Sequence, residues 1–286
     1  MNNERPNWGC DPELHLFDVD FNRIVSAIDV LKCDKHNPID LGDGIKCYAD
    51  NVLIEASMPP SDTIAGIVRT VGESLRRMQS LLGKRYRLVA KASHVYDDRD
   101  MQDPKAKEAG CSQNFDAYTG EANLPPRFDG NMRTGSFHIH MGWSYLSTPE
   151  RRVEMIKHLD RCLGLASVVF DVDESAGRRR QLYGKAGEFR PTPYGVEYRV
   201  LGNYVIRSPE LLTLAYEIAE YATQVMQGNA GMRFQPRVTK QVRDAINTNN
   251  YQEAHALLHN FLTDFLTQAA SKPRSVDLYR DWKIKI

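Results

Sequence analysis

The chain has 286 residues, enough for one large domain or two small ones with a sizeable hydrophobic core. Its 37 Lys and Arg residues balance 37 Asp and Glu residues, and this zero net charge argues against binding nucleic acid or an anionic membrane through bulk charge. The five cysteines form no CxxC pair, and no stretch approaches the roughly 18 apolar residues of a membrane span. We therefore expect a globular protein of a reducing compartment, the cytoplasm, without a nucleic-acid or membrane partner.

Several segments carry apolar residues at helical spacing, bounded by capping residues and by Pro or Gly. The predicted helices are Ser61–Leu82 with Ser61 as N-cap, Pro149–Cys162 capped by Ser147 or Thr148, Pro209–Met226 capped by Ser208, and a C-terminal pair, Lys240–Asn247 and Tyr251–Ala269.

Strand-like segments alternate with these helices. They are Leu14–Phe17, Ile45–Ser57, Tyr86–Lys91, Ser136–Trp143, Ala166–Asp171 and Gly195–Leu201. Because no regular βαβ rhythm is present, the pattern favours an α+β fold with an antiparallel or mixed sheet. The long polar tract between Val95 and Arg133 is aperiodic, which is typical of a functional loop.

Polar residues share one face of two of these strands. His138 and His140 lie two residues apart, so they point to the same face, opposite Ile139 and Met141. Two imidazoles on such a face can bind a metal or a phosphate, although a simple solvated face is an equally good interpretation. Similarly, Glu197 and Arg199 share a face: they are either a surface ion pair or a metal-binding carboxylate beside a phosphate-contacting guanidinium.

Two acidic segments add carboxylates near strand ends. Asp11 and Glu13 flank Pro12, where turn and capping roles are common, and the spacing predicts Asn51 and Glu55 on one strand face. A single Glu near a strand end is usually just exposed. Taken with the two strands above, however, these oxygen-rich groups indicate Mg²⁺ or Mn²⁺ better than zinc.

Basic residues concentrate between Arg178 and Arg190, where Gly184 and Gly187 would let backbone amides approach an anion. The segment contains neither GxxxxGK[ST] nor GxGxxG. It is either a solvated basic loop or a site for a polyphosphate.

In combination, these motifs resemble the phage-type carboxylate–amine ligases, amidoligases with a glutamine-synthetase-like fold. The resemblance covers about residues 8–230 and rests on the segments just described together with Pro59-Pro60 and Gly110-Cys111. It implies a curved antiparallel or mixed sheet with helices packed on one face, a catalytic domain over 8–234 and a helical extension over 235–286.

The resemblance also implies roles for individual residues. Metal ligands would be Glu13, Glu55, Glu197 and His138 or His140, with Asp11 or Asp50 as additions. Many relatives carry two glutamates where this chain has Asp-Pro-Glu, so the identity of the first ligand stays open. ATP phosphates would be bound by Arg178, Arg180, Lys185, Arg190 and Arg199, of which Lys185, Arg190 and Arg199 would also act in catalysis.

The implied reaction is ATP-dependent amide formation from a carboxylate and an amine through an acyl phosphate, with Mg²⁺ or Mn²⁺. The substrates would be a free amino acid, a peptide or a protein side chain. If the protein is phage-encoded, it would be located in the cytoplasm of the host cell. The polar tract before Arg133 would be a substrate lid. Two alternatives remain: a metal-dependent amide hydrolase without nucleotide, and a non-catalytic protein on the same fold.

Overall fold

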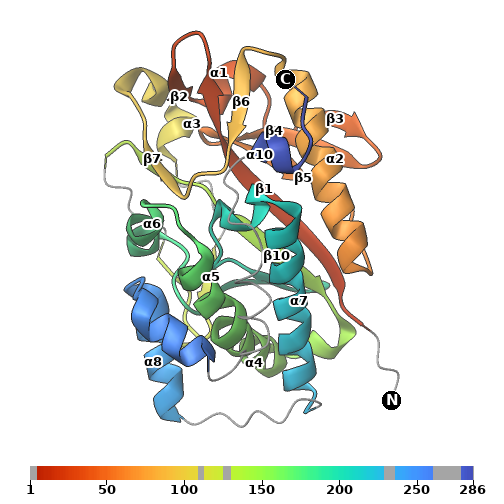
Figure 1. The fold of residues 1–286 in the computed structure, drawn as a ribbon, viewed down its shortest axis with the longest axis vertical. Coiled ribbons are helices and arrows are strands. Elements are labelled where there is room, and N and C mark those ends of the chain that lie inside the picture. The colour runs from red at the N-terminus through yellow and green to blue at the C-terminus, as the bar shows by residue number, and fades with distance from the viewer. Residues whose placement is uncertain (1–4, 109–112, 125–129, 229–235, 260–277, 286) are drawn as a thin grey trace.

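An open antiparallel sheet forms the centre of the molecule in a computed structural model that describes residues 5–108, 113–124, 130–228, 236–259 and 278–285 (Figure 1). Its main strand order is β3-β4-β5-β1-β10-β12-β11-β8, and β2 and β6 pair with the second half of β1. The strands are β1 (Asn7–Asp18), β2 (Arg23–Val25), β3 (Ile39–Gly42), β4 (Ile45–Asp50), β5 (Leu53–Ser57), β6 (Tyr86–Val89), β8 (Phe115–Asp116), β10 (Phe137–Gly142), β11 (Glu188–Thr192) and β12 (Gly195–Tyr198). A separate pair joins β7 (Ser93–Val95) to β9 (Met132–Thr134).

The described helices connect these strands or follow them. They are α1 (Ala27–Leu31), α2 (Ile64–Leu82), α3 (Pro104–Lys107), α4 (Pro149–Leu159), α5 (Leu165–Phe170), α6 (Ala176–Leu182), α7 (Pro209–Met226), α8 (Pro236–Asn247), residues 251–259 and α10 (Leu278–Asp281). Short 3-10 turns are η1 (Asp98–Met101), η2 (Ser144–Leu146) and η4 (Asn203–Arg207), and a π-helical turn, η3 (Asp160–Gly164), joins α4 to α5.

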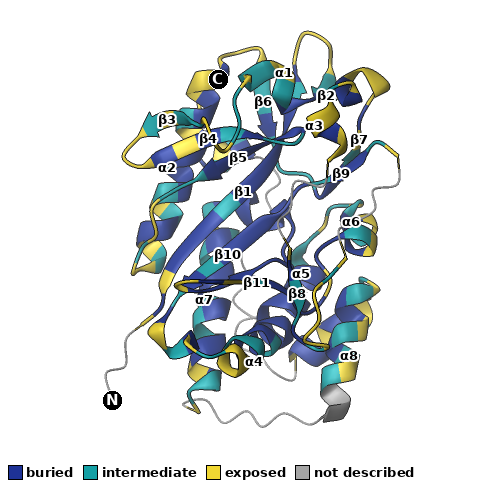
Figure 2. Cartoon of the chain, turned by 180° about the vertical axis from the view of Figure 1, so that it is seen from behind, coloured by how far each residue is buried: buried dark blue, intermediate teal, exposed yellow. Residues whose placement is uncertain are grey.

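The sheet has one covered face and one face that carries the polar side chains. Helices α2, α4, α5 and α7 lie on one side, and the opposite view shows β1, β10 and β11 in front of them (Figure 2). Apolar residues that alternate along the central strands, such as Leu14, Ile139 and Val196, join the core. The prediction of an α+β fold with a large antiparallel sheet is confirmed, whereas its glutamine-synthetase-like details stay a prediction.

Helix ends follow the predicted capping chemistry at two positions. Ser208 accepts a hydrogen bond from Leu211 N at 3.2 Å and starts α7, and Thr148 does the same for α4 with Arg151 N at 3.4 Å. The predicted cap Ser61 is wrong: α2 begins later, with Thr63 as its N-cap. The backbone of Ser61 instead pairs with Trp8, which fixes the chain beside β1.

Two strand predictions are wrong. Residues 166–171, which were predicted to form a strand, belong mostly to helix α5. The prediction failed because a short apolar run that is buried on all sides has no hydrophobic period by which a strand can be told from a helix. The expected strand Ile45–Ser57 is a hairpin of β4 and β5. Asn51 lies in its turn with φ of 57°, so it does not share a strand face with Glu55; Asp50 lies beside Glu55 instead.

The C-terminal part is helical where it is described, as predicted over α8 and residues 251–259, while residues 260–269 fall outside the described residues. Helix α8 contacts α5, α6 and η3, and its buried residues Val242 and Ile246 join the same core as the sheet. The division at residue 235 therefore stays a prediction. In the described ranges, no helix has the length and hydropathy needed to cross a membrane.

Candidate active site

Three carboxylates converge on the polar face of β1, β4 and β5. Antiparallel register sets Glu13 opposite Glu55, and Tyr48 lies on the other side of Glu55. One oxygen from each of Glu13, Asp50 and Glu55 lies within 4.8 Å of the others. Glu13 and Glu55 are buried, so water screens the repulsion between the carboxylates only weakly.

Burial and crowding favour protonation of this group. Burial, followed by the neighbouring Asp50, raises the pKa of Glu13 to about 8. The pKa of Glu55 rises well above its usual value through burial and then the charges of Asp11, Glu13 and Asp50. A divalent cation would remove this repulsion, and three carboxylates are the donors that Mg²⁺ prefers.

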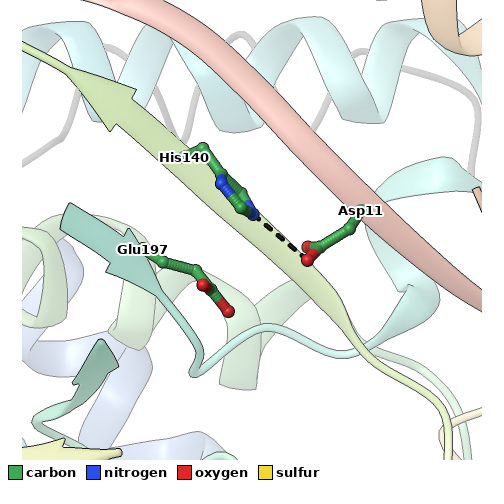
Figure 3. A group of neighbouring side chains, drawn as sticks. All are labelled: Asp11, His140 and Glu197. Carbon is green, nitrogen blue, oxygen red and sulfur yellow. Dashed lines mark ion pairs between the residues drawn. The ribbon is translucent and has the colours of Figure 1, made fainter. Parts of the chain in front are cut away.

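A second group lies on the next strands: Asp11 of β1, His140 of β10 and Glu197 of β12 point into a common space (Figure 3). The register pairs Gly9 with His140 and His140 with Glu197, which lines up one face across three strands. One ligand atom from each of the three side chains lies within 4.8 Å of the others. Two carboxylates and an imidazole suit Mn²⁺ or Mg²⁺.

Asp11 lies between the two histidines. Its Oδ1 is 3.2 Å from His138 Nδ1, and its Oδ2 is 3.2 Å from His140 Nε2. Burial opposes the charge of Asp11, but His140 and then His138 outweigh it and lower the pKa of this carboxyl. Burial likewise opposes the charged form of His140, yet Asp11 raises the pKa of that imidazole; burial and Arg199 lower the pKa of His138.

Two atoms of this group lack a well-aligned hydrogen bond. Asp11 Oδ1 and His140 Nε2 are buried and unsatisfied, even though an ionisable group lies 3.2 Å from each, His138 from the first and Asp11 from the second. Buried polar atoms rarely stay unpaired. These atoms are the ones that a cation between Asp11, His140 and Glu197 would use, so the residues present fit a divalent metal ion.

Glu197 is fully buried and pairs with two arginines. Its Oε2 accepts a hydrogen bond from Arg190 Nε at 2.6 Å, and its Oε1 forms an ion pair with Arg199. His138 Nδ1 lies 3.5 Å from the same carboxylate. The ion pair expected as one alternative is therefore present, but it is buried and shared with Arg190 instead of lying on the surface.

Three tyrosines that were not predicted as site residues form hydrogen bonds with side chains of the site. The hydroxyl of Tyr48 donates to Glu55 Oε1 at 2.7 Å, and that of Tyr194 lies 2.6 Å from His140 Nδ1. Tyr183 lies 3.3 Å from His138 Nε2 and accepts a hydrogen bond from Arg199. Tyr48 had a detectable signal, because it alternates with Asp50 along β4; the other two are brought to the site only by the fold.

The basic segment divides between the surface and the interior. Arg178 on α6 and Lys185 in the loop before β11 are exposed, and in the described residues no contact joins either side chain to the carboxylates. Arg190 and Arg199, in contrast, lie on the polar face beside Glu197.

Arg180, which was predicted to bind nucleotide, is buried inside the protein, and that role stays a prediction. Its side chain is buried and donates to Asn249 Oδ1, Gly184 O and Ser167 Oγ, so its hydrogen-bonding capacity holds the protein together. One of the two glycine amides that were expected to approach an anion has a partner within the protein. Gly184 N donates to Glu188 Oε2 at 2.8 Å, which closes this loop from within.

The structure thus brings most of the predicted site residues to one sheet face. We call Asp11, Glu13, Asp50 and Glu55 the acidic flank, and Arg190 and Arg199 the basic flank. Glu197, His138 and His140 lie between them. The motif Gly110-Cys111 falls outside the described residues. The roles of all these side chains as ligands remain predictions.

Comparison with known proteins identifies the family over part of the chain. Residues 128–245 match the family model described as phage phiEco32-like COOH.NH2 ligase-type 2. The match contains His138, His140, Glu197 and both arginines of the basic flank, and it extends past residue 235, where the helical extension was predicted to begin. No curated protein matches the chain. The family model that residues 128–245 match agrees with the family that the sequence motifs indicated, the phage-type carboxylate–amine ligases.

Proposed function

We propose that the protein is an ATP-dependent carboxylate–amine ligase that uses Mg²⁺ or Mn²⁺ and forms an amide through an acyl phosphate. The family match supports ligation of a carboxylate and an amine. The observation that carries the nucleotide and metal part is the meeting of two ligand groups and two arginines on one sheet face.

The charges of the site match the demands of this reaction. A substrate carboxylate and the γ-phosphate repel each other, so a catalyst has to neutralise both. The cations held by Glu13, Asp50 and Glu55 and by Asp11, His140 and Glu197 would neutralise phosphate and carboxylate oxygens when bound. Arg190 and Arg199 would contact phosphate oxygens from the other flank, and Glu197 holds both guanidinium groups in place.

The proposed reaction has two steps. A substrate carboxylate oxygen attacks the γ-phosphorus of ATP, the bond to the β-phosphate oxygen breaks, and ADP leaves. The amine nitrogen then attacks the acyl carbon, the carbon–oxygen bond to phosphate breaks, and the nitrogen loses a proton as inorganic phosphate departs. The hydroxyls of Tyr48 and Tyr194 orient Glu55 and His140. They would thus keep these two candidate metal ligands in position during both steps.

A screen of ADP release over carboxylates, with Mg²⁺, ATP and hydroxylamine as a small neutral amine, tests the proposal. A carboxylate-dependent release of ADP, together with a hydroxamate product, is the expected result. The variant Glu55→Gln should lose this activity, while Glu253→Gln, which changes a partly exposed glutamate outside the site, should keep it. Amide cleavage without ATP would instead support the hydrolase alternative, and a protein that neither binds nor turns over nucleotide would support the non-catalytic one.

A further inference from the structure

Tyr183 lies where the chain leaves helix α6, and the backbone fixes it there. Its conformation is extended, with φ of −153° and ψ of 154°, and its N–H donates to Arg179 O at 2.8 Å. The next residue, Gly184, has φ of 77°, which residues with a side chain rarely adopt, and a Cβ there would lie 2.0 Å from Arg179 Nη1. The Tyr-Gly pair thus ends the helix at a defined point, with the Tyr183 side chain buried beside Arg179.

Arg179 supports the ring of Tyr183 and is itself firmly held. Its guanidinium lies 5.5 Å from the centre of the Tyr183 ring, and its side chain is 1% exposed. It donates to four acceptors just before β10 and just after β12, at 2.7–3.2 Å. These are Gly135 O, Ser136 Oγ, Val200 O and Leu201 O. The Tyr183 ring therefore packs against a group that is bound to both strands carrying His138 and Glu197.

The hydroxyl of Tyr183 contacts two side chains of the site. It accepts a hydrogen bond from Arg199 Nε and lies 3.3 Å from His138 Nε2. The Arg199 guanidinium also lies over the Tyr183 ring, 5.4 Å from its centre. Arg199 is thus held at two nitrogens, Nε by Tyr183 and Nη1 by Glu197 Oε1. Because a guanidinium is planar, two such bonds fix both its position and the direction of its plane.

The two arginines of the basic flank are held by different oxygens of Glu197. Arg190 contacts Oε2, to which its Nε donates at 2.6 Å, whereas Arg199 pairs with Oε1. The hydrogen bond and the ring contact of Tyr183 described above are both made with Arg199. Arg199, whose side chain is 3% exposed, is therefore the arginine whose direction depends on Tyr183.

We propose that Tyr183 is a positioning residue for Arg199, which it holds in the direction needed to contact a phosphate oxygen of the nucleotide. Without the hydroxyl, a buried Nε–H would lose its acceptor, and the guanidinium could turn about its remaining bond to Glu197. This inference rests on the proposed ligase function, in which Arg199 contacts phosphate, and adds the residue that orients this arginine.

Tyr183→Phe removes the hydroxyl and keeps the ring. Calorimetric titration of the full-length protein with ATP and Mg²⁺, at a temperature where each variant is folded, should give a Kd at least fivefold higher than that of the wild type. Tyr198→Phe is the matched control: it also removes a buried hydroxyl, which donates to Asp160 Oδ1 at 2.7 Å, but on the strand face opposite Glu197. The control should lose stability and keep the wild-type Kd. An unchanged Kd in Tyr183→Phe, or an equal loss in both variants, would overturn the inference.

A double-mutant cycle tests whether Tyr183 acts through Arg199. In the Arg199→Met background, Tyr183→Phe should change the Kd for ATP with Mg²⁺ less than twofold, whereas in the Arg190→Met background the loss of at least fivefold should persist. If Arg199→Met does not fold or binds too weakly, Arg199→Lys, which has no Nε–H, takes its place. A full loss in the Arg199 background would mean that Tyr183 acts through another group, which would overturn the inference.

The same cycle measured by urea unfolding needs no nucleotide and separates the two proposals. If the wild type binds ATP with Mg²⁺ but Tyr183 and Arg199 are not coupled in either measurement, the ligase proposal stands and the positioning role fails. If the two residues are coupled in unfolding but the wild type does not bind ATP, the ATP-dependent function fails, and the role of Tyr183 in nucleotide binding fails with it.

Discussion

The acidic and basic flanks share one sheet face but differ in how their buried charges are compensated. On the acidic flank, carboxylates crowd one another, and burial raises the pKa values of Glu13 and Glu55. On the basic flank, the positive charges of Arg190 and Arg199 are paired with Glu197 inside the protein. The carboxylates of the acidic flank therefore need a proton or a cation to relieve their repulsion, whereas the charges of the basic flank are already compensated by Glu197 within the protein.

The largest effect is expected for Glu197→Gln, which removes the charge that both arginines share. Because Arg199 is 3% exposed, its guanidinium would be left buried without an opposing charge. We expect ADP release to fall at least about 100-fold and the free energy of unfolding to fall by about 3–5 kcal/mol. Urea unfolding and the ADP assay measure both, with Glu253→Gln, a change at a partly exposed glutamate outside the site, as the control. If Glu197→Gln kept the stability of the wild type, this would refute the claim that Glu197 neutralises Arg190 and Arg199 inside the protein.

Arg180→Met distinguishes a structural arginine from one of the basic flank. It leaves Gly184 O and the Ser167 hydroxyl without their buried donor, so we expect a loss of about 2–4 kcal/mol in stability. The KM for ATP should stay unchanged in the protein that remains folded. Arg190→Met should raise that KM, and it should also lower the stability, because it removes one of the two guanidinium groups paired with the buried Glu197. An ATP-binding defect in Arg180→Met at temperatures where it is folded would instead support the prediction that Arg180 binds nucleotide.

Glu13→Gln tests the repulsion on the acidic flank, and here we expect the substitution to raise the stability of the protein instead of lowering it. In EDTA, the folded protein retains the Glu13 proton up to about pH 8, while the unfolded chain releases it near pH 4.5, so stability should fall as the pH rises through this window. Glu13→Gln should flatten this decline and be more stable than the wild type at pH 8 by a few kcal/mol, on the order of magnitude that such a shift implies. Activity should still be lost. A destabilised Glu13→Gln protein at pH 8 would contradict this account.

The smallest effect is expected for Tyr194→Phe, which removes the hydroxyl beside His140 Nδ1. Without it, the ring is oriented less well, and we expect the affinity for Mn²⁺ to fall about tenfold. Manganese titration followed by electron paramagnetic resonance measures this loss. Tyr145→Phe, on a tyrosine outside the site, serves as the control, and an unchanged Mn²⁺ affinity in Tyr194→Phe would remove the tyrosine from the metal site.

Local signals explain which parts were predictable from sequence. Ser208 before Pro209 marked the start of α7, and the alternation around His138 and Glu197 placed β10 and β12 and their polar face. The run of apolar residues 166–171 was ambiguous because burial on all sides removes any period. The direction of Arg180 depends on Asn249, far along the chain, so no local pattern reports it.

Calorimetric titration of ATP with Mg²⁺ and in EDTA tests the central claim, that the two flanks form one metal–nucleotide site. The account predicts binding with Mg²⁺, at least tenfold weaker binding in EDTA, and loss of the Mg²⁺-dependent part in the double variant Glu13→Gln with Glu55→Gln. The control Glu253→Gln should bind like the wild type. Equal ATP affinity with and without Mg²⁺, or no binding in either condition, would contradict the claim.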